Sequence, residues 1–528
     1  MADSRLTFED VVNDANKVEK LYKTCYNGVA KHRCKIFNWV SFESLTDNAF
    51  DEKFGGSLGR WYFGRLSPSE SALRLNTGSG NFGTGGSYWG YYWEAIKACN
   101  LFINNIDQIT VPPDDLLPEY LAALVDEARI LRAYYHIQLL GMYGAVPFMT
   151  EDYSNNPTYW STLKRPEFND VALAIANDLQ EVIDNNIVDY KRLDLADKDR
   201  VPLSFAYGLK SRVLLYNASP LNNPSGDSEK YRLAAEAAKQ FIDRGEYTLE
   251  PFENTKKALY NSPLSANVEA VEVIWRGTDP FRNLSNIAGL NLKETVPSVA
   301  NQKGFRVGEV PTQEVVDCYE LKTGEMIIES YGDGTHTSPI ITQEAKDAGY
   351  DDINNPYANR DERFYRDILF NGNYFGDTYD GDSIVVYTYQ YYKTDSIGDS
   401  VFTTLVPTPG TGNNGANIDG AKHQTYTGYY FAKDRNPIYY GRAKHQNLCN
   451  QHSVLMRFAE IYLNYAEALC GAGRFSEACD ALDMTRLRAN QPSIKDVKGF
   501  SLDKEWLMKR IHNERRVELL LEDHRFFD

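Results

Sequence analysis

The feature that most constrains the fold of this chain is an apolar stripe at helical spacing over residues 118–143. Its members recur three or four residues apart: Leu121, Leu124, Ala128, Leu131, Tyr135, Leu139 and Met142. This spacing places them on one face of an α-helix, and Pro118 is tolerated in a first helical turn. Gly144 and Pro147 end the run. The stripe therefore predicts one long helix with a single apolar face.

Two further stretches have the form of helix pairs. Residues 205–216 and 231–244 flank the turn-rich sequence SPLNNPSGD, and residues 455–469 and 475–486 flank GAGR. The second pair, YAEALCGAGRFSEACDAL, resembles a tetratricopeptide repeat, because small residues let two helices approach closely and the glycine turn reverses the chain. A rougher apolar stripe predicts one more helix over residues 504–526.

These patterns predict a mainly α fold of tetratricopeptide-like helical pairs that form an α-superhelical scaffold. The scaffold is expected mainly over residues 93–250 and 454–528. The Gly- and aromatic-rich residues of about 50–92 and 260–440 are expected to form long loops and a small β-containing excursion. Within the second of these, the run SIVVYTYQYY over Ser383–Tyr392 is typical of a strand.

The charge balance excludes one class of partner. With 56 basic and 73 acidic residues the formal charge is −17, a field that repels a phosphate backbone, so no nucleic-acid partner is expected. No run of about 18 apolar residues occurs, so no membrane-spanning helix is expected. The chain has seven cysteines, an odd number, and its sequence contains no C-x-x-C motif. Both observations argue against a disulfide framework.

Two stretches match the residue pattern of a known motif, but the sequence around each lacks the secondary structure that the motif requires. Residues 78–83 fit G-x-G-x-x-G, yet the polar sequence before them provides no strand and no βαβ alternation follows. Residues 55–59 fit G-x-S-x-G, yet the strand–turn–helix of a nucleophile elbow is missing around them. Both stretches are interpreted as flexible glycine loops.

Two groups of residues have metal-like composition. His445, Cys449 and His452 have ligand-like spacing but no fourth ligand nearby, so core or surface roles are favoured over a zinc site. The sequence DTYDGD at residues 377–382 offers oxygen ligands without the order of an EF-hand. No cofactor is therefore predicted, apart from opportunistic binding of calcium at residues 377–382.

Several segments, read in chain order, share a pattern over nearly the whole sequence. The most telling is EARILRAYYHIQLLGMYGAVPFMTED (127–152), where a helix with alternating Arg and paired aromatics runs into a YGAVP turn. Others include WEAIKACNLFINNID (93–107), LKRPEFNDVALAIANDLQEVID (163–184), PTQEVVDCYELKTGE (311–325), YANRDERFYRDILFNG (357–372), LMRFAEIYLNYAEALCGAG (455–473) and NERRVELLLEDHRFFD (513–528). In this order they resemble the SusD/RagB family of outer-membrane nutrient-binding lipoproteins.

The resemblance implies a single SusD-like unit over residues 1–528 that binds glycans, occasionally peptides, without catalysis of its own. It implies a partner, a SusC-like TonB-dependent transporter, on which the helical face packs while the loops stay free for ligand. It also implies a cell-surface protein held at the outer membrane by a lipidated N-terminal cysteine. Since the first cysteine is Cys25, this anchor is expected upstream of Met1, and the family pattern also continues beyond Asp528.

Residues 60–92 combine the two things that a sugar site needs. Aromatic rings pack against faces of C–H bonds, and polar side chains meet the hydroxyl groups. Glycines in this segment permit backbone excursions. The resemblance adds Trp275, because the family often places ligand contacts between that position and the PTQ sequence. The candidate glycan-binding residues are Trp61, Tyr62, Arg65, Asn81, Tyr88, Trp89 and Trp275.

Six of the seven candidates have a structural alternative. Trp61, Tyr62 and Trp89 suit anchors beneath a long loop equally well, Arg65 and Asn81 suit solvation of that loop, and core packing rivals ligand contact at Trp275. Arg129 and Arg132, with Asp126 one helical turn before, are expected to organise packing between helices.

Two other function classes stay open. A helical glycoside hydrolase would need two carboxylates about 5–10 Å apart. A tetratricopeptide adaptor would bind a peptide in a groove on the helices and have no use for long aromatic loops. Aromatic platforms tolerate many sugars, so the sequence does not name the glycan.

Overall fold

The computed structural model describes most of the chain, with gaps. The described residues are 8–26, 28–29, 42–51, 57–65, 87–151, 156–192, 200–255, 268–275, 309–350, 356–370, 373–377, 383–386, 391–397, 400–406, 427–433 and 452–528.

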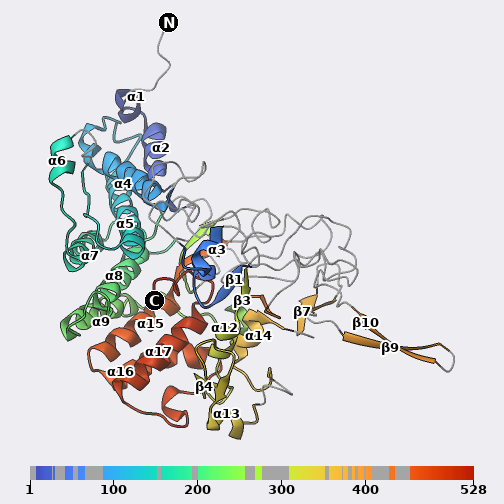
Figure 1. Cartoon of the computed structure of the whole chain (residues 1–528). Coiled ribbons are helices and arrows are strands. Elements are labelled where there is room, and N and C mark those ends of the chain that lie inside the picture. Colours follow the sequence, from blue (N-terminus) through green and yellow to red (C-terminus); the bar gives the residue numbers. More distant parts are fainter. Residues whose placement is uncertain are drawn as a thin grey trace.

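Helices form the frame of the molecule, as the sequence predicts. Figure 1 shows them stacked along the chain from α2 towards α9, with α15, α16 and α17 continuing the stack. Neighbours in this stack are in contact: α4 with α5, α7 with α8, α8 with α9, and α9 with α15. The helices are α1 Phe8–Val12, α2 Ala15–Tyr26, α3 Ser57–Tyr62, α4 Tyr88–Asn104, α5 Pro118–Tyr143, α6 Pro157–Thr162, α7 Phe168–Asn185, α8 Leu203–Ala218, α9 Ser228–Ile242, α12 Gln313–Cys318, α13 Gln343–Asp347, α14 Glu362–Asp367, α15 Phe458–Gly471, α16 Phe475–Arg488 and α17 Lys504–Glu518, with short 3-10 turns η2 Phe42–Leu45, η4 Ile106–Gln108 and η10 Ile494–Asp496.

The predicted helix pairs are confirmed. The apolar stripe at residues 118–143 becomes α5 with the same bounds, and α8 with α9 and α15 with α16 form antiparallel pairs joined by the predicted turns. In the GAGR turn Gly473 has a φ of 81°, in the left-handed region where a side chain is strained. The chain is therefore mainly α, with a helical scaffold of tetratricopeptide-like pairs.

The last predicted helix is shorter than expected. The stripe at residues 504–526 predicts one helix, but α17 ends at Glu518. Leu521 and Asp523 have φ values of 61° and 62°, which an α-helix does not accommodate. The backbone N–H of Leu521 instead donates to the Glu43 carboxylate at 3.0 Å, so a tertiary contact replaces the helical one.

Strands form only two-stranded antiparallel ladders among the described residues. They pair as β1 with β3, β2 with β12, β4 with β5, β6 with β11, β7 with β8, and β9 with β10. The predicted strand at Ser383–Tyr392 is confirmed in two parts, β8 and the start of β9. The strands are β1 Ala49–Asp51, β2 Ala270–Trp275, β3 Glu309–Pro311, β4 Ile328–Tyr331, β5 Pro339–Ile341, β6 Ile368–Leu369, β7 Asn373–Asp377, β8 Ser383–Val386, β9 Tyr391–Ile397, β10 Ser400–Val406, β11 Tyr430–Phe431 and β12 His452–Arg457.

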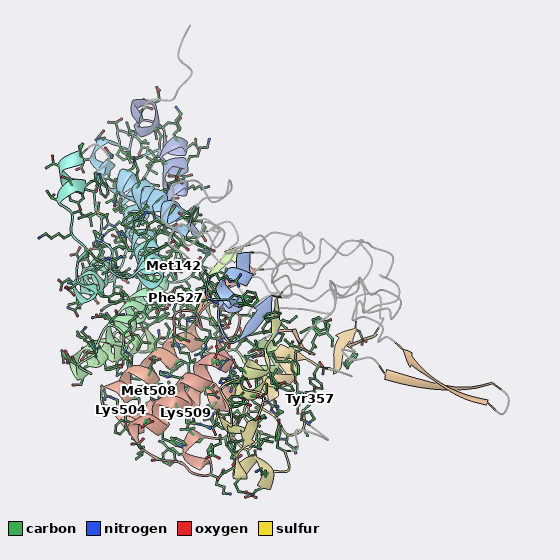
Figure 2. The ribbon with its side chains drawn as sticks, in the orientation of Figure 1. Met142, Tyr357, Lys504, Met508, Lys509 and Phe527 are labelled. Atoms are coloured by element: carbon green, nitrogen blue, oxygen red, sulfur yellow. The ribbon has the colours of Figure 1, made fainter. Side chains whose placement is uncertain are left out.

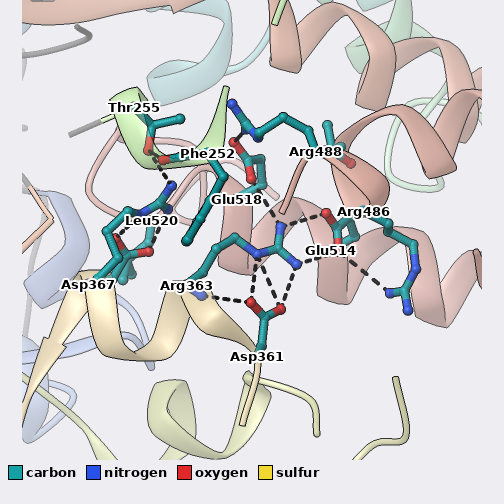
Figure 3. A network of polar contacts seen from close by, with 12 residues as sticks. Phe252, Thr255, Asp361, Arg363, Asp367, Arg486, Arg488, Glu514, Glu518 and Leu520 are labelled. Atoms are coloured by element: carbon teal, nitrogen blue, oxygen red, sulfur yellow. Dashed lines mark hydrogen bonds and ion pairs between the residues drawn. The ribbon is translucent and has the colours of Figure 1, made fainter. Parts of the chain in front are cut away.

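The main apolar core runs through the helical stack, and a smaller one lies among α12, α14, β6 and β11. Buried ion pairs join the two parts. Arg363 of α14 lies 2.7 Å from Asp361, 2.6 Å from Glu514 and 3.0 Å from Glu518, all about 1% exposed (Figure 3). Since a buried charge is costly unless paired, these contacts fix the position of α14 against α17.

Arg129 and Arg132 also act between helices, as expected. Arg129 binds Asp178 of α7 at 2.7 Å and Asp126 at 3.5 Å, and Arg132 binds Asp178 at 3.0 Å. Arg132 reaches Asn100 of α4 as well, at 3.1 Å, so α4, α5 and α7 are connected. Within the described residues no helix has the length and apolarity needed to cross a bilayer.

Candidate functional site

Helix α3 lies where the helical body meets the strand-containing part of the molecule (Figure 1). Two of its rings pack against the rest of the molecule. Tyr62 stacks on Phe50 of β1 with ring centroids 5.2 Å apart, and its hydroxyl donates to the carbonyl of Ser44 at 2.9 Å. Trp61 is half-buried and its ring lies 6.3 Å from that of Phe526. These contacts anchor α3 and hold the residues that follow it.

The end of α3 presents a ring and a cation to solvent. Phe63 is 64% exposed, and the guanidinium of the exposed Arg65 lies 5.6 Å from the centre of its ring. Gly64 between them has a φ of 63°, which turns the chain so that both side chains can meet. We call Trp61, Phe63 and Arg65 the α3 ledge. Phe63 was not predicted from the sequence, although the run Trp-Tyr-Phe at residues 61–63 was the available signal.

Two other candidate residues, Tyr88 and Trp89, lie at the start of α4 and differ in burial. Tyr88 is 1% exposed, with its ring 5.6 Å from Phe42 and 5.9 Å from Tyr92, so in this structure the ring is not available to a ligand. Trp89 is half-buried and meets Tyr143 edge-on at 5.2 Å and Trp93 at 5.6 Å. The ring of Tyr88 therefore belongs to the apolar core, and the ring of Trp89 lies at the edge of that core.

The structure therefore brings only part of the predicted set together. Phe42 contacts Phe526 at 5.0 Å as well as Tyr88, so Trp61 and Tyr88 belong to one aromatic cluster. Trp89 faces α5 instead. Asn81 lies outside the described residues. Trp275 ends β2 opposite His452 of β12, and its side chain lies outside the described part.

The metal-like groups are only partly described. Among the described residues no three His, Cys, Asp or Glu side chains gather in a way that suits a metal ion. Of DTYDGD only Asp377, the end of β7, is described, and of the His445–Cys449–His452 group only the backbone of the last is. Calcium binding at residues 377–382 stays a prediction.

The α3 ledge has the chemistry of a polar-ligand platform. An exposed ring face packs against C–H groups, and an adjacent guanidinium donates to hydroxyl or carbonyl oxygens. The inward half of α3 is fixed by Tyr62, so little ordering is left to occur on binding.

Comparison with known proteins shows what the chain is similar to. A model of the SusD family matches residues 272–528. The structure of a SusD-like protein from Bacteroides fragilis NCTC 9343 is similar with a TM-score of 0.70, at 20% identity, over 100% of this chain and 86% of that chain. Residues 272–528 thus match the SusD family, and the chain as a whole has the fold of SusD-like proteins. No curated protein matches its sequence.

Two more solved structures share the SusD-like fold. A SusD-like carbohydrate binding protein from Bacteroides fragilis NCTC 9343 has a TM-score of 0.66 and 18% identity, over 98% of this chain and 86% of that chain. Surface glycan-binding protein A from Bacteroides thetaiotaomicron, solved in complex with laminarihexaose, has a TM-score of 0.54 and 15% identity, over 97% of this chain and 89% of that chain.

Proposed function

We propose that this protein captures a glycan at the α3 ledge and delivers it to a SusC-like TonB-dependent transporter without cleaving it. The observation that carries the proposal is the exposed ring of Phe63 with the Arg65 guanidinium beside it, on a helix anchored by Tyr62. A ring face next to a hydrogen-bond donor matches the two kinds of surface of a sugar. The glycan-bound relative with the same fold supports this class of ligand.

The same proposal places the protein at the cell surface. A lipid anchor would hold it at the outer membrane, with the helical scaffold against the transporter and the α3 ledge turned to the medium. The rings of Trp89 and Trp275 and the amide of Asn81 remain proposed contacts with the glycan.

The test is titration calorimetry of the purified chain against laminarihexaose, a neutral α-glucan, a neutral β-glucan, a fructan and a galacturonan. Phe63→Ala and Arg65→Ala should each weaken binding about fivefold to tenfold, as expected for loss of one stacked ring or one charged hydrogen bond. Trp160→Ala is the matched control, because that ring is 50% exposed on α6, on the other side of the body. Unchanged affinity in both ledge variants would rule out the α3 ledge.

Two measurements separate the proposal from its rivals. A reducing-sugar assay that shows breakdown of any of these polysaccharides would favour a glycoside hydrolase. Binding of peptides with no binding of any glycan would favour a peptide-binding member of the family. Co-purification with a co-expressed SusC-like transporter tests the delivery step independently of ligand binding.

A further inference from the structure

A second aromatic surface lies beside α14. Tyr357 and Phe370 stack with ring centroids 4.2 Å apart and 27° between their planes, and Tyr365 meets Phe370 at 6.3 Å. Tyr357 and Phe370 are half-buried, while Tyr365 is 40% exposed. Figure 2 shows Tyr357 at the side of the molecule away from α15 and α16. We call Tyr357, Tyr365 and Phe370 the α14 wall.

The α14 wall is held in place from behind. The buried Phe364 stacks on Phe370 at 5.3 Å, and the guanidinium of Arg360 lies 4.7 Å from the ring of Phe364. The hydroxyl of Tyr365 donates to the carbonyl of Tyr357 and accepts from the backbone N–H of Arg360 at 3.4 Å. Rings fixed by such contacts lose little freedom on binding, which favours a rigid platform.

A short series of strands connects this surface with the α3 ledge. Helix α14 leads directly into β6, which pairs with β11, and β11 contacts β3. Strand β3 pairs with β1, whose Phe50 carries the ring of Tyr62 from α3. Figure 1 shows α3, β1, β3 and α14 close together beside the helical body. The two aromatic surfaces are thus parts of one fixed framework.

We propose that the α14 wall binds a second stretch of the glycan chain held at the α3 ledge, so that the protein prefers extended neutral polysaccharides to short oligosaccharides. This inference rests on the proposed function and adds the ligand class to it. Two separated ring platforms are engaged together only by a chain long enough to reach both, and the second contact then forms within the complex. The net charge of −17 opposes polyanions, which leaves neutral glycans as the matching class.

The experiment compares a polysaccharide that binds in the calorimetric panel with the hexasaccharide prepared from it. For the unmodified chain we expect tighter binding of the polymer per binding site. Tyr365→Ala should weaken polymer binding about fivefold and leave hexasaccharide binding unchanged, since one stacked ring contributes about 1 kcal/mol. Tyr365→Phe keeps the ring but loses the two hydroxyl contacts, so it should weaken polymer binding less than Tyr365→Ala. Trp160→Ala is the exposed-ring control, and thermal melting of every variant checks folding.

The outcomes are distinct. Equal affinity of the unmodified chain for the polymer and the hexasaccharide would overturn the α14 wall and leave the α3 ledge intact. A Tyr365→Ala variant that binds the polymer as tightly as the unmodified chain does would have the same consequence. Preference for the galacturonan would overturn the neutral ligand class. No glycan binding by the unmodified chain would overturn the proposed function and this inference with it.

Discussion

Arg212 of α8 binds Glu460 of α15 through two hydrogen bonds, Nε to Oε1 at 2.7 Å and Nη2 to Oε2 at 2.6 Å, and both side chains are buried. The two residues are far apart in the sequence and belong to different helix pairs. Their contact joins the first half of the helical scaffold to the second. Arg212 also donates to the carbonyl of Leu455 at 3.2 Å, just before α15 begins.

Removing one partner of this pair should be costly. Glu460→Gln leaves the Arg212 guanidinium buried without its countercharge, so we expect a loss of about 3–5 kcal/mol in the free energy of unfolding. Replacing both residues, Arg212→Met with Glu460→Leu, should recover much of this loss because no buried charge remains. Urea unfolding of the unmodified chain and of both variants measures these changes in the free energy of unfolding. Equal losses in the single and double variants would show that shape, not charge, holds α8 to α15.

Acid should weaken the fold through His136. The backbone N–H of Met149 donates to its Nε2 at 3.0 Å, so Nδ1 carries the proton and donates to the carbonyl of Arg132 at 2.8 Å. Burial, with the nearby charge of Arg132, lowers the pKa of His136 to about 3. Below pH about 6.5 the His136 side chain takes up a proton in the unfolded chain but not in the folded chain. The contribution of neutral His136 to the free energy of unfolding is therefore fully present above pH 6.5 and is lost as the pH falls towards 3.

The expected slope is about 1.4 kcal/mol of unfolding free energy per pH unit below pH 6.5. His136→Gln should flatten the dependence between about pH 6 and pH 4.5 by that amount, measured by urea unfolding at several pH values. His524, whose pKa burial also lowers to about 3, adds a second such contribution that the variant retains. An unchanged slope in His136→Gln would assign the acid sensitivity to other groups.

Gly471 should not tolerate a methyl group. A Cβ at this position, in the last turn of α15, would lie 2.2 Å from a ring carbon of Tyr231 on α9. Gly471→Ala must therefore push α9 and α15 apart, at a cost of about 1–3 kcal/mol. Gly334→Ala is the control, because open space surrounds that position and its change should stay within about 0.5 kcal/mol. Thermal melting compares the two; equal shifts would contradict close packing at Gly471.

Stability and ligand binding should separate within the α3 ledge. Phe63→Ala removes a ring that is mostly in water, so the melting temperature should stay nearly unchanged. Trp61→Ala removes a half-buried ring that contacts Phe526, and we expect a loss of about 1–3 kcal/mol. A large destabilisation by Phe63→Ala would mean that its ring packs in the fold.

The sequence indicated the helices well where local rules decide them. Pro118 and Gly144 mark the ends of α5, and the GAGR turn marks the reversal between α15 and α16. The prediction was wrong at the end of α17, because the apolar stripe continues past Glu518 although the helix ends there. A tertiary hydrogen bond of the Leu521 N–H replaces the helical one. The placement of Arg129 and Arg132 between helices followed from charged residues beside an apolar face.

The candidate site shows the limit of the same reasoning. Residues such as Tyr88 and Trp89 are adjacent in a helix that starts in an aromatic run, and the pattern alone does not say which ring faces the core. In the fold Phe42, from a distant turn, covers Tyr88, and Phe63 projects because Tyr62 before it is held by Ser44.

By itself the sequence determined the helical periodicity, the turns and the SusD-like order of segments, because each depends on residues close together in the chain. Only the tertiary structure decided which aromatic rings are buried, which carboxylates neutralise Arg212 and Arg363, and which rings gather at α3 and α14. Burial and charge pairing arise from contacts between residues tens to hundreds of positions apart, and no local pattern specifies them.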